Sequence, residues 1–541
     1  MKKYLYIATV AALFASCDED YVAVNPLEPV APTPDDTEYV SGSADFSTFV
    51  SVGNSLTAGY SDSALFIDGQ TTSFPNTIAG QMALAGGGDF TQPMMADNLG
   101  GMTLGGNPIS GNRLYLADPF GTPGPVPVAG QGTTEVSDKL AGPFNNMGVP
   151  GAKSYHLLAP GYGALAGVAT GASNPYFARM STSETTTVMA DAMEMNPTFF
   201  SLWIGNNDIL GFATSGGVGV DQTGNPDPST YGGNDITDPA VFAATYQGLV
   251  QTLVSGGAKG IISNIPDITT IPYFTTVPYN ALSPDALGDQ IPLLNQVYGA
   301  LNGVYAYAGV EGRDIYFSDA MANPVVVFDE ELADMGATIS AVLGASPEFA
   351  LFVQSLGLPA EAVPLVAQLM GDTYGQSRQA NAEDLLVFTS ATAIGTVNEK
   401  RVGELVLAGL SPEMAGTFSV EGVTLPLEDK WVLTVEEKEM VSTAQQAYNL
   451  TISTIAENNS DIAFFDAEAA MQELAGAGVT MNGLTTTATY ATGGAFSLDG
   501  VHPSPRGYAI ISNMMMEVIN GTFGSNLPPV NVKDFKGVYV N

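Results

Sequence analysis

The segment that decides the fold lies near the start of the chain, where residues 46–59 read FSTFVSVGNSLTAG. Residues 46–52 form an apolar run that is typical of a buried strand. Gly53 and Asn54 interrupt this run, and Ser55 follows at the expected start of a helix. Ligands of open α/β sheets bind outside the carboxyl ends of the strands, so this order of residues places the Ser55 hydroxyl in such a crevice. An ordinary helix N-cap serine is the alternative interpretation, because the same junction favours one.

Strand-like and helix-like segments alternate along the rest of the chain. Apolar runs predict three further buried strands, at residues 198–204, 259–265 and 462–467. Helical apolar spacing predicts three helices, at 241–257, about 434–457 and about 504–519. Since strand–helix–strand is the unit of a parallel sheet, we expect an α/β fold with helices on both faces of a central parallel sheet.

Two long regions depart from this alternation. Residues 61–145 are rich in glycine, which predicts loops over the surface rather than additional sheet. Residues 322–432 contain mostly helical, apolar stretches, such as residues 347–370. Buried packing is one interpretation of these stretches, and a helical cap over the functional site is the other. We treat both regions as insertions into one domain.

The charge of the chain excludes a large class of partners. Its 541 residues include 16 basic and 55 acidic ones, for a formal net charge of -39. Such a chain repels the phosphate backbone of nucleic acids and the surface of anionic membranes. A hydrophobic content of 45% supports a sizeable buried core. We therefore expect a folded protein that binds no nucleic acid and that needs a hydrophobic or covalent device to attach to a membrane.

The N-terminus supplies such a device. Residues 1–16 combine two lysines with an apolar run too short to span a bilayer, as expected of a signal peptide. The segment before Cys17, the only cysteine, resembles the lipobox of bacterial lipoproteins, in which the cysteine is lipidated. This resemblance implies export and a lipid anchor in the outer membrane. Residues 18–20 (DED) are similar to the surface-display tag of Bacteroidota lipoproteins, although acidic residues also simply solvate a linker.

The remaining boundaries follow from composition. Residues 17–44 are acidic and rich in proline, without helical or strand periodicity, as expected of a semi-extended tether. We expect the folded domain at 45–525 and a C-terminal tail at 526–541.

The two histidines have different sequence surroundings. A serine nucleophile needs a nearby base, which is usually a histidine held by a carboxylate. His156 has no acidic residue near it in the sequence, which favours a structural role. His502 follows Asp499 by three residues and precedes a proline and an expected helix. A turn of this kind can hold one imidazole nitrogen against the carboxylate and leave the other free to act as a general base.

Four segments together resemble the four sequence blocks of the SGNH/GDSL hydrolase family, in the family's order. They are GNSLTAG (53–59), NMGVPGA (146–152), WIGNND (203–208) and DGVHP (499–503). The resemblance covers about residues 46–520 and implies a three-layer α/β/α sandwich similar to flavodoxin. It also implies that Ser55, Asp499 and His502 form a catalytic triad. The family pattern has aspartate where this chain has Asn54, a change that we expect to alter local hydrogen bonding and to leave the mechanism intact.

The resemblance also implies an oxyanion hole. Its donors would be the N–H groups of Ser55 and Gly151 and the side-chain amide of Asn207. Gly148 competes with Gly151 for this role, and the spacing from Asn146 favours Gly151. Asp208 is expected to brace the third block, and Trp203 to belong to the core.

The function implied by the resemblance is that of a serine esterase or lipase acting on acyl esters, with no metal and no cofactor. Two alternatives stay open. One is an esterase of the same fold that removes acetyl groups from polysaccharides. The other is a non-catalytic surface lipoprotein that binds glycan or lipid, because a fold by itself does not establish activity.

Overall fold

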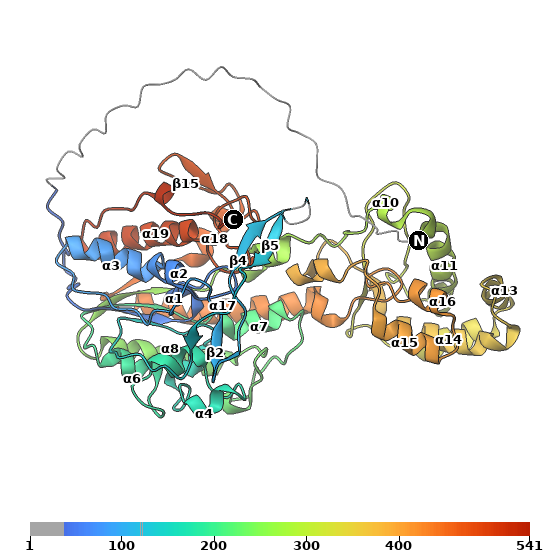
Figure 1. Ribbon diagram of the computed structural model, residues 1–541, viewed down its shortest axis with the longest axis horizontal. Coiled ribbons are helices and arrows are strands. Elements are labelled where there is room, and N and C mark those ends of the chain that lie inside the picture. The colour runs from blue at the N-terminus through green and yellow to red at the C-terminus, as the bar shows by residue number, and fades with distance from the viewer. Residues whose placement is uncertain (1–36, 119–120, 122, 541) are drawn as a thin grey trace, which may run out of the picture.

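The computed structural model describes residues 37–118, 121 and 123–540 (Figure 1). The predicted signal peptide, the predicted lipidation site Cys17 and most of the predicted tether lie outside these residues.

A five-stranded parallel sheet organises the larger of two lobes. Its strands, in spatial order, are β14 (Ile462–Phe465), β9 (Lys259–Ser263), β8 (Phe199–Trp203), β1 (Phe49–Gly53) and β7 (Asn146–Gly148). The predicted strands are confirmed, while the three-residue β7 is too short to show a period in the sequence. Counted along the chain, the strand order is 2-1-3-4-5, one of the two common orders of doubly wound sheets.

Helices pack on both faces of this sheet because successive side chains of a strand point to opposite sides. Val50 and Val52 of β1 belong to a hydrophobic cluster with α6 (Val188–Met193), α8 (Pro239–Val254) and α17 (Val435–Glu457). Phe49 of β1 belongs to a second cluster with α3 (Phe74–Leu84) and α19 (Pro505–Phe523). Figure 1 shows α3 and α19 above the sheet and α6 and α8 below it. The predicted helices and the α/β class are confirmed.

The glycine-rich region 61–145 is more structured than the sequence predicted. It contains α2 (Ile67–Thr71) and α3, and α3 buries Phe74, Ile78 and Met82 against the sheet. The prediction of surface loops was therefore wrong for α3. The glycines that follow α3 in the sequence had favoured loops, although α3 itself has an apolar face. The rest forms small sheets apart from the central one, from β2 (Met102–Leu104), β3 (Asn107–Pro108), β4 (Leu114–Ala117), β5 (Gly124–Pro127) and β6 (Thr134–Glu135).

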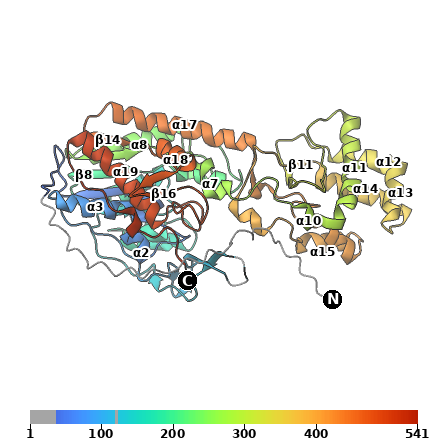
Figure 2. The same cartoon turned by 90° about the horizontal axis from the view of Figure 1, so that it is seen from above.

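A helical lobe lies beside the sheet domain, at the right of Figures 1 and 2. Its helices are α10 (Pro284–Leu287), α11 (Ile291–Ala308), α12 (Gly336–Ala345), α13 (Pro347–Ser355), α14 (Val363–Tyr374), α15 (Glu399–Leu407) and α16 (Pro412–Thr417). Its own hydrophobic cluster runs from Val277 to Val432, so the lobe begins well before the expected boundary at 322. Phe349, Phe352 and Val353 are buried in that cluster, which confirms buried packing for these side chains.

The remaining elements are short. The helices are α1 (Ser55–Ala58), α4 (Leu165–Val168), α5 (Pro175–Met180), α7 (Asn207–Thr214), α9 (Pro272–Thr275) and α18 (Ala467–Ala475). The strands are β10 (Val326–Phe328), β11 (Ser377–Gln379), β12 (Leu385–Leu386), β13 (Val432–Leu433), β15 (Val479–Met481) and β16 (Leu484–Thr486).

Both ends of the described chain pack on the sheet domain. The backbone N–H of Ser43 donates to the carbonyl of Phe523 over 2.7 Å, so the ordered domain begins before Asp45. At the other end Val532 is fully buried, and the ring of Tyr539 lies edge-on to Phe66 at 5.6 Å. Residues 526–540 are therefore part of the folded domain rather than a tail.

No single helix within residues 37–118, 121 and 123–540 is long and apolar enough to cross a membrane. One pair, α12 and α13, passes the same test of length and composition only as two helices joined at a bend of 85°.

Candidate active site

Ser55 lies at the junction between β1 and α1, at the carboxyl edge of the sheet. The helix N-cap is Asn54, whose side-chain oxygen accepts from the N–H of Leu56 over 3.0 Å. The Ser55 hydroxyl is thus not the capping group, contrary to the alternative interpretation from sequence. Glycine is required at position 53, because a Cβ there would lie 2.2 Å from Oγ1 of Thr57 and 2.4 Å from the carbonyl of Trp203.

The structure brings Ser55, His502 and Asp499 together in one hydrogen-bonded chain. Nε2 of His502 lies 2.8 Å from Oγ of Ser55, and Nδ1 lies 2.9 Å from Oδ2 of Asp499. In this order a carboxylate orients an imidazole whose other nitrogen faces a hydroxyl, the arrangement that activates serine nucleophiles. With these three groups, His502 can take the proton of Ser55 while the serine oxygen attacks an electrophilic carbon.

Asp499 is held as an anion by several donors. Its Oδ1 accepts from the N–H groups of Val501 and His502 and from the Ser497 hydroxyl, and its Oδ2 accepts from the N–H of Ser63. Burial acts to raise the pKa of Asp499. The His502 ring and these hydrogen bonds outweigh burial and lower the pKa to about 2. Asp499 is therefore ionised at neutral pH and can stabilise a positively charged His502.

The loop after α1 reinforces this arrangement. The ring of Tyr60 packs on His502 with centroids 4.6 Å apart. Asp62 adopts a positive φ of 51° and accepts from the N–H of Leu498 over 2.9 Å, which ties the nucleophile segment to the Asp499 loop. Burial, together with the nearby charge of Asp499, raises the pKa of Asp62 to about 7. Sequence reasoning missed both residues, because their only signal was nearness to Ser55 along the chain.

The two predicted oxyanion donors follow the strands on either side of β1. Gly151 lies in the turn after β7 with φ +81°, and its N–H bonds to no acceptor among the described residues. Asn207 is the first residue of α7, after β8, and its side-chain amide donates to the carbonyl of Ala152 over 2.9 Å. One amide hydrogen of Asn207 therefore fixes the side chain to the Gly151 turn, and the other is available to a ligand.

Asp208 braces the same two loops, as expected. It is fully buried, and its carboxylate accepts from the N–H of Ser154 over 2.8 Å and from the Ser154 hydroxyl over 2.7 Å. Trp203 is 3% exposed and packs edge-on to Phe74 and Phe465. The indole is a core residue that also borders the pocket described below.

Asn54 has a contact that the aspartate of the family pattern would not make. Its amide Nδ2 donates to Oδ1 of Asn206 over 3.3 Å. A carboxylate at this position has no hydrogen to donate and would face the Asn206 oxygen with a second acceptor. An aspartate could pair with Asn206 only if the Asn206 amide were reversed, so that its NH₂ group donated. Asn206 also lines the pocket, and sequence reasoning did not single it out.

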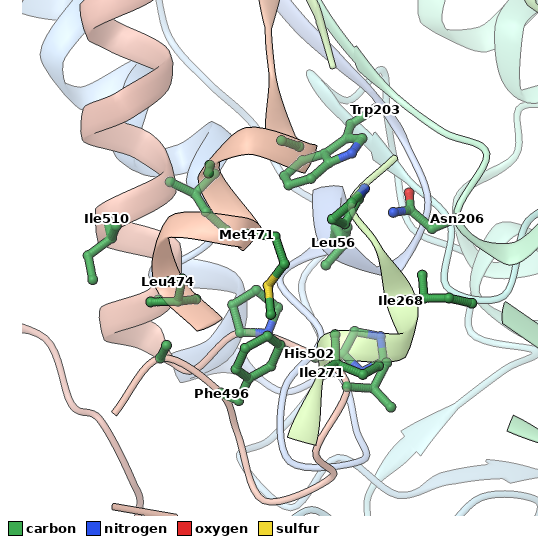
Figure 3. A pocket seen from close by; sticks show the side chains of 18 of the residues that line it. Leu56, Trp203, Asn206, Ile268, Ile271, Met471, Leu474, Phe496, His502 and Ile510 are labelled. Atoms are coloured by element: carbon green, nitrogen blue, oxygen red, sulfur yellow. The ribbon is translucent and has the colours of Figure 1, made fainter. Parts of the chain in front are cut away.

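A largely apolar pocket opens beside Ser55 and His502. Its cavity volume is about 120 Å³, and Figure 3 shows His502 among the side chains that line it. In α18 the lining residues are Ala467, Ala470, Met471 and Leu474. In α19 they are Gly507, Ile510, Ile511 and Met514. In each helix these positions have the spacing i, i+3, i+4, i+7 that puts them on one face, so two apolar faces border one space. This space can hold an extended apolar group next to the Ser55 hydroxyl.

No described residue in 322–432 lines this pocket. The cap interpretation of that region is therefore not supported by the pocket. The lobe reaches only the rim of the site, where the ring of Phe388 packs on Tyr490 at 4.7 Å and the Tyr490 hydroxyl donates to the carbonyl of Leu498.

His156 has structural contacts of its own. Its Nδ1 accepts from the N–H of Lys153 over 3.0 Å, and its ring stacks on Tyr162 with centroids 4.5 Å apart. Burial, and then the nearby charge of Lys153, lowers the pKa of His156 to about 4. These contacts agree with the structural role expected from sequence.

No protein-family model, no curated protein and no solved structure matches this chain.

Proposed function

We propose that this protein is a serine esterase that hydrolyses carboxylic acyl esters and that it belongs with the SGNH/GDSL hydrolases. The single observation that supports the activity is the pair of consecutive hydrogen bonds that connects Asp499 to His502 (2.9 Å) and His502 to Ser55 (2.8 Å). The 2-1-3-4-5 strand order and the helices on both faces support the flavodoxin-like sandwich of that family.

The mechanism follows from the positions of these groups. His502 Nε2 takes the proton of Ser55 as the serine oxygen attacks the ester carbonyl. The resulting oxyanion receives hydrogen bonds from the N–H groups of Ser55 and Gly151 and from the Asn207 amide. His502 returns the proton to the departing alcohol, which leaves an acyl group on Ser55. A water molecule then loses a proton to His502 and attacks the acyl-enzyme, which releases the carboxylic acid and restores Ser55.

The apolar pocket favours esters with an extended acyl chain, rather than acetylated polysaccharides, as the substrates. Its lining is formed mainly by aliphatic and aromatic side chains, which gain little from an acetyl group or a sugar ring. A series of p-nitrophenyl esters from acetyl to palmitoyl tests this choice. We expect kcat/KM to rise beyond acetyl, whereas a maximum at acetyl would favour the polysaccharide deacetylase.

Ser55→Ala tests the activity itself. We expect the variant to fold and to lose both ester turnover and labelling by a fluorophosphonate probe, because the probe reacts only with an activated serine. Ser47→Ala is the matched control, since Ser47 is an exposed serine before the opposite end of β1. Labelling of the Ser55→Ala variant at the wild-type rate, or no labelling of the wild type, would leave the non-catalytic binding protein as the better proposal.

A further inference from the structure

Three carboxylates meet where the helical lobe joins the sheet domain. Glu330 follows β10 in the lobe, Asp429 begins a short 3-10 helix, and Glu437 lies in the first turn of α17. One oxygen of each residue lies within 4.8 Å of the corresponding oxygens of the other two. Figure 2 shows α17 running from the lobe along the sheet domain, so the cluster lies at the lobe end of this helix.

The most buried member of the cluster has an oxygen without a partner. Glu437 is 2% exposed, and its Oε2 accepts from the N–H and the hydroxyl of Thr434 as part of a capping box. Its Oε1 is buried and has no hydrogen-bond partner among the described residues, and the same is true of Oδ1 of Asp429. Buried acceptors without partners are rare and costly, so these two oxygens indicate a missing partner.

A glycine packs directly against that oxygen. Gly217 follows α7 with φ +83°, and a Cβ there would lie 1.6 Å from Oε1 of Glu437. At the neighbouring Gly216, a Cβ would lie 2.4 Å from the carbonyl oxygen of Asp429. The two glycines that follow α7 therefore contribute only backbone atoms next to the cluster.

No lysine or arginine among the described residues forms an ion pair with the three carboxylates. Two basic residues near the cluster in sequence or through a partner are engaged elsewhere. Arg378 pairs with Asp384 and with Asp329, the neighbour of Glu330, and Lys430, the neighbour of Asp429, pairs with Glu428. Among the described residues, the three carboxylates therefore have no basic partner, and Glu437 accepts only from the N–H and the hydroxyl of Thr434.

We propose that Glu330, Asp429 and Glu437 bind one Ca²⁺ ion that links the helical lobe to α17. Carboxylate oxygens are the ligands that hard divalent cations prefer. Ca²⁺ holds its oxygens at about 2.3–2.6 Å, so three oxygens that lie within 4.8 Å of one another can bind the same ion. Mg²⁺ needs a near-ideal octahedron at about 2.1 Å and gives up its water reluctantly, so a site built from protein carboxylates favours Ca²⁺.

Calorimetric titration of the full chain tests the site directly. Chelator-treated protein in about 150 mM NaCl, a concentration that screens the surface charge, is titrated with CaCl₂ and separately with MgCl₂. We expect one saturable Ca²⁺ per chain, bound roughly tenfold or more tightly than Mg²⁺. We also expect Ca²⁺ to raise the thermal midpoint relative to protein in chelator, since the ion binds the folded state.

Charge-neutralising variants assign the ligands. Glu437→Gln and Asp429→Asn should each weaken Ca²⁺ binding roughly tenfold or more, and glutamine can still serve the capping box. Glu436→Gln is the matched control, because Glu436 lies exposed in the same turn of α17 and outside the cluster. It should bind Ca²⁺ as the wild type does. If Glu437→Gln does not fold, the exposed Glu330→Gln provides the same test.

Two outcomes would overturn the proposal. One is the absence of a saturable site in the wild-type chain, which would leave a proton as the missing partner. The other is Ca²⁺ uptake that the cluster variants do not change, which would indicate weak binding over a surface with net charge -39. Ser55→Ala should bind Ca²⁺ unchanged, so this test does not depend on the proposed esterase activity.

Discussion

At the scale of single residues, the candidate site depends on atoms that face each other across long stretches of chain. Ser55 and His502 are separated by 447 positions and meet at 2.8 Å. The sequence predicted this pair from the type of each residue and its local neighbours. It did not predict the bond from the N–H of Ser63 to Asp499 or the amide pair of Asn54 and Asn206, because each of these contacts joins segments that only the fold brings together.

Asn207→Ala tests the oxyanion hole. If the free amide hydrogen of Asn207 stabilises the transition state, kcat should fall about 10²–10³-fold with a smaller change in KM. Ester hydrolysis and the thermal midpoint are measured together, because the variant also loses the bond to the Ala152 carbonyl. A fall in kcat that simply follows a loss of folded protein would contradict the assignment.

His156→Asn tests whether protonation of His156 lowers the free energy of unfolding at acidic pH. The pKa of His156 is lowered to about 4, against about 6.5 in an unfolded chain. Between these two pKa values His156 is protonated in the unfolded chain and neutral in the folded chain. The free energy of unfolding therefore falls as the pH drops from about 6.5 to 4. The loss from this group should be about 2–3 kcal/mol.

Urea unfolding at pH 7.5 and pH 4.5 measures this difference. Asparagine keeps an acceptor for the N–H of Lys153, so the variant should fold while losing less stability between the two pH values than the wild type. Equal losses in both proteins would show that His156 does not titrate in this range.

At the scale of helices and strands, the pocket is made by two amphipathic helices that face each other. The sequence predicted α19 from its helical periodicity and did not predict α18. Even for α19 the position of the pocket stayed open, because a stripe that faces a pocket has the same pattern as one that faces a core. The segment 347–370 was a candidate cap over the site. Its residues Phe349, Phe352 and Val353 instead pack in the core of the helical lobe, and no residue of the segment lines the pocket.

Ala470→Phe tests the pocket. The larger side chain fills the space between α18 and α19, so kcat/KM for octanoyl and longer esters should fall roughly tenfold or more while acetyl ester turnover changes little. Ala469→Phe is the control, because Ala469 is the exposed neighbour on the same helix and does not line the pocket. Equal losses for acetyl and octanoyl esters in Ala470→Phe would place the acyl chain elsewhere.

At the scale of the whole molecule, the sheet domain and the helical lobe are each built around hydrophobic clusters of their own. The sheet domain contains the candidate site, and the lobe has its own core from Val277 to Val432. The long helix α17 begins beside the acidic cluster and packs along α8 of the sheet domain. The proposed Ca²⁺ site therefore lies where the position of one core relative to the other is set.

Cys17→Ser tests the proposed lipid anchor, which lies outside the described residues. In a bacterium that processes lipoproteins, the wild-type chain should incorporate labelled palmitate and fractionate with membranes. The variant should lose both properties, because the thioether that carries the lipid needs the cysteine sulfur. Ser55→Ala should keep the label, and a labelled Cys17→Ser chain would place the modification elsewhere.

The sequence by itself determined the order of strands and helices, the α/β class and the identity of the serine, histidine and aspartate that meet at the sheet edge. The strands and helices follow from local periodicity, and His502 is one of only two histidines in the chain. The resemblance of four sequence blocks pointed to Ser55 and Asp499. Only the tertiary structure decided where apolar faces meet a cavity, that α3 and residues 526–540 belong to the domain, and that three acidic residues converge at a junction. These are contacts between distant segments, and periodicity along the chain has no information about which distant surface a side chain will face.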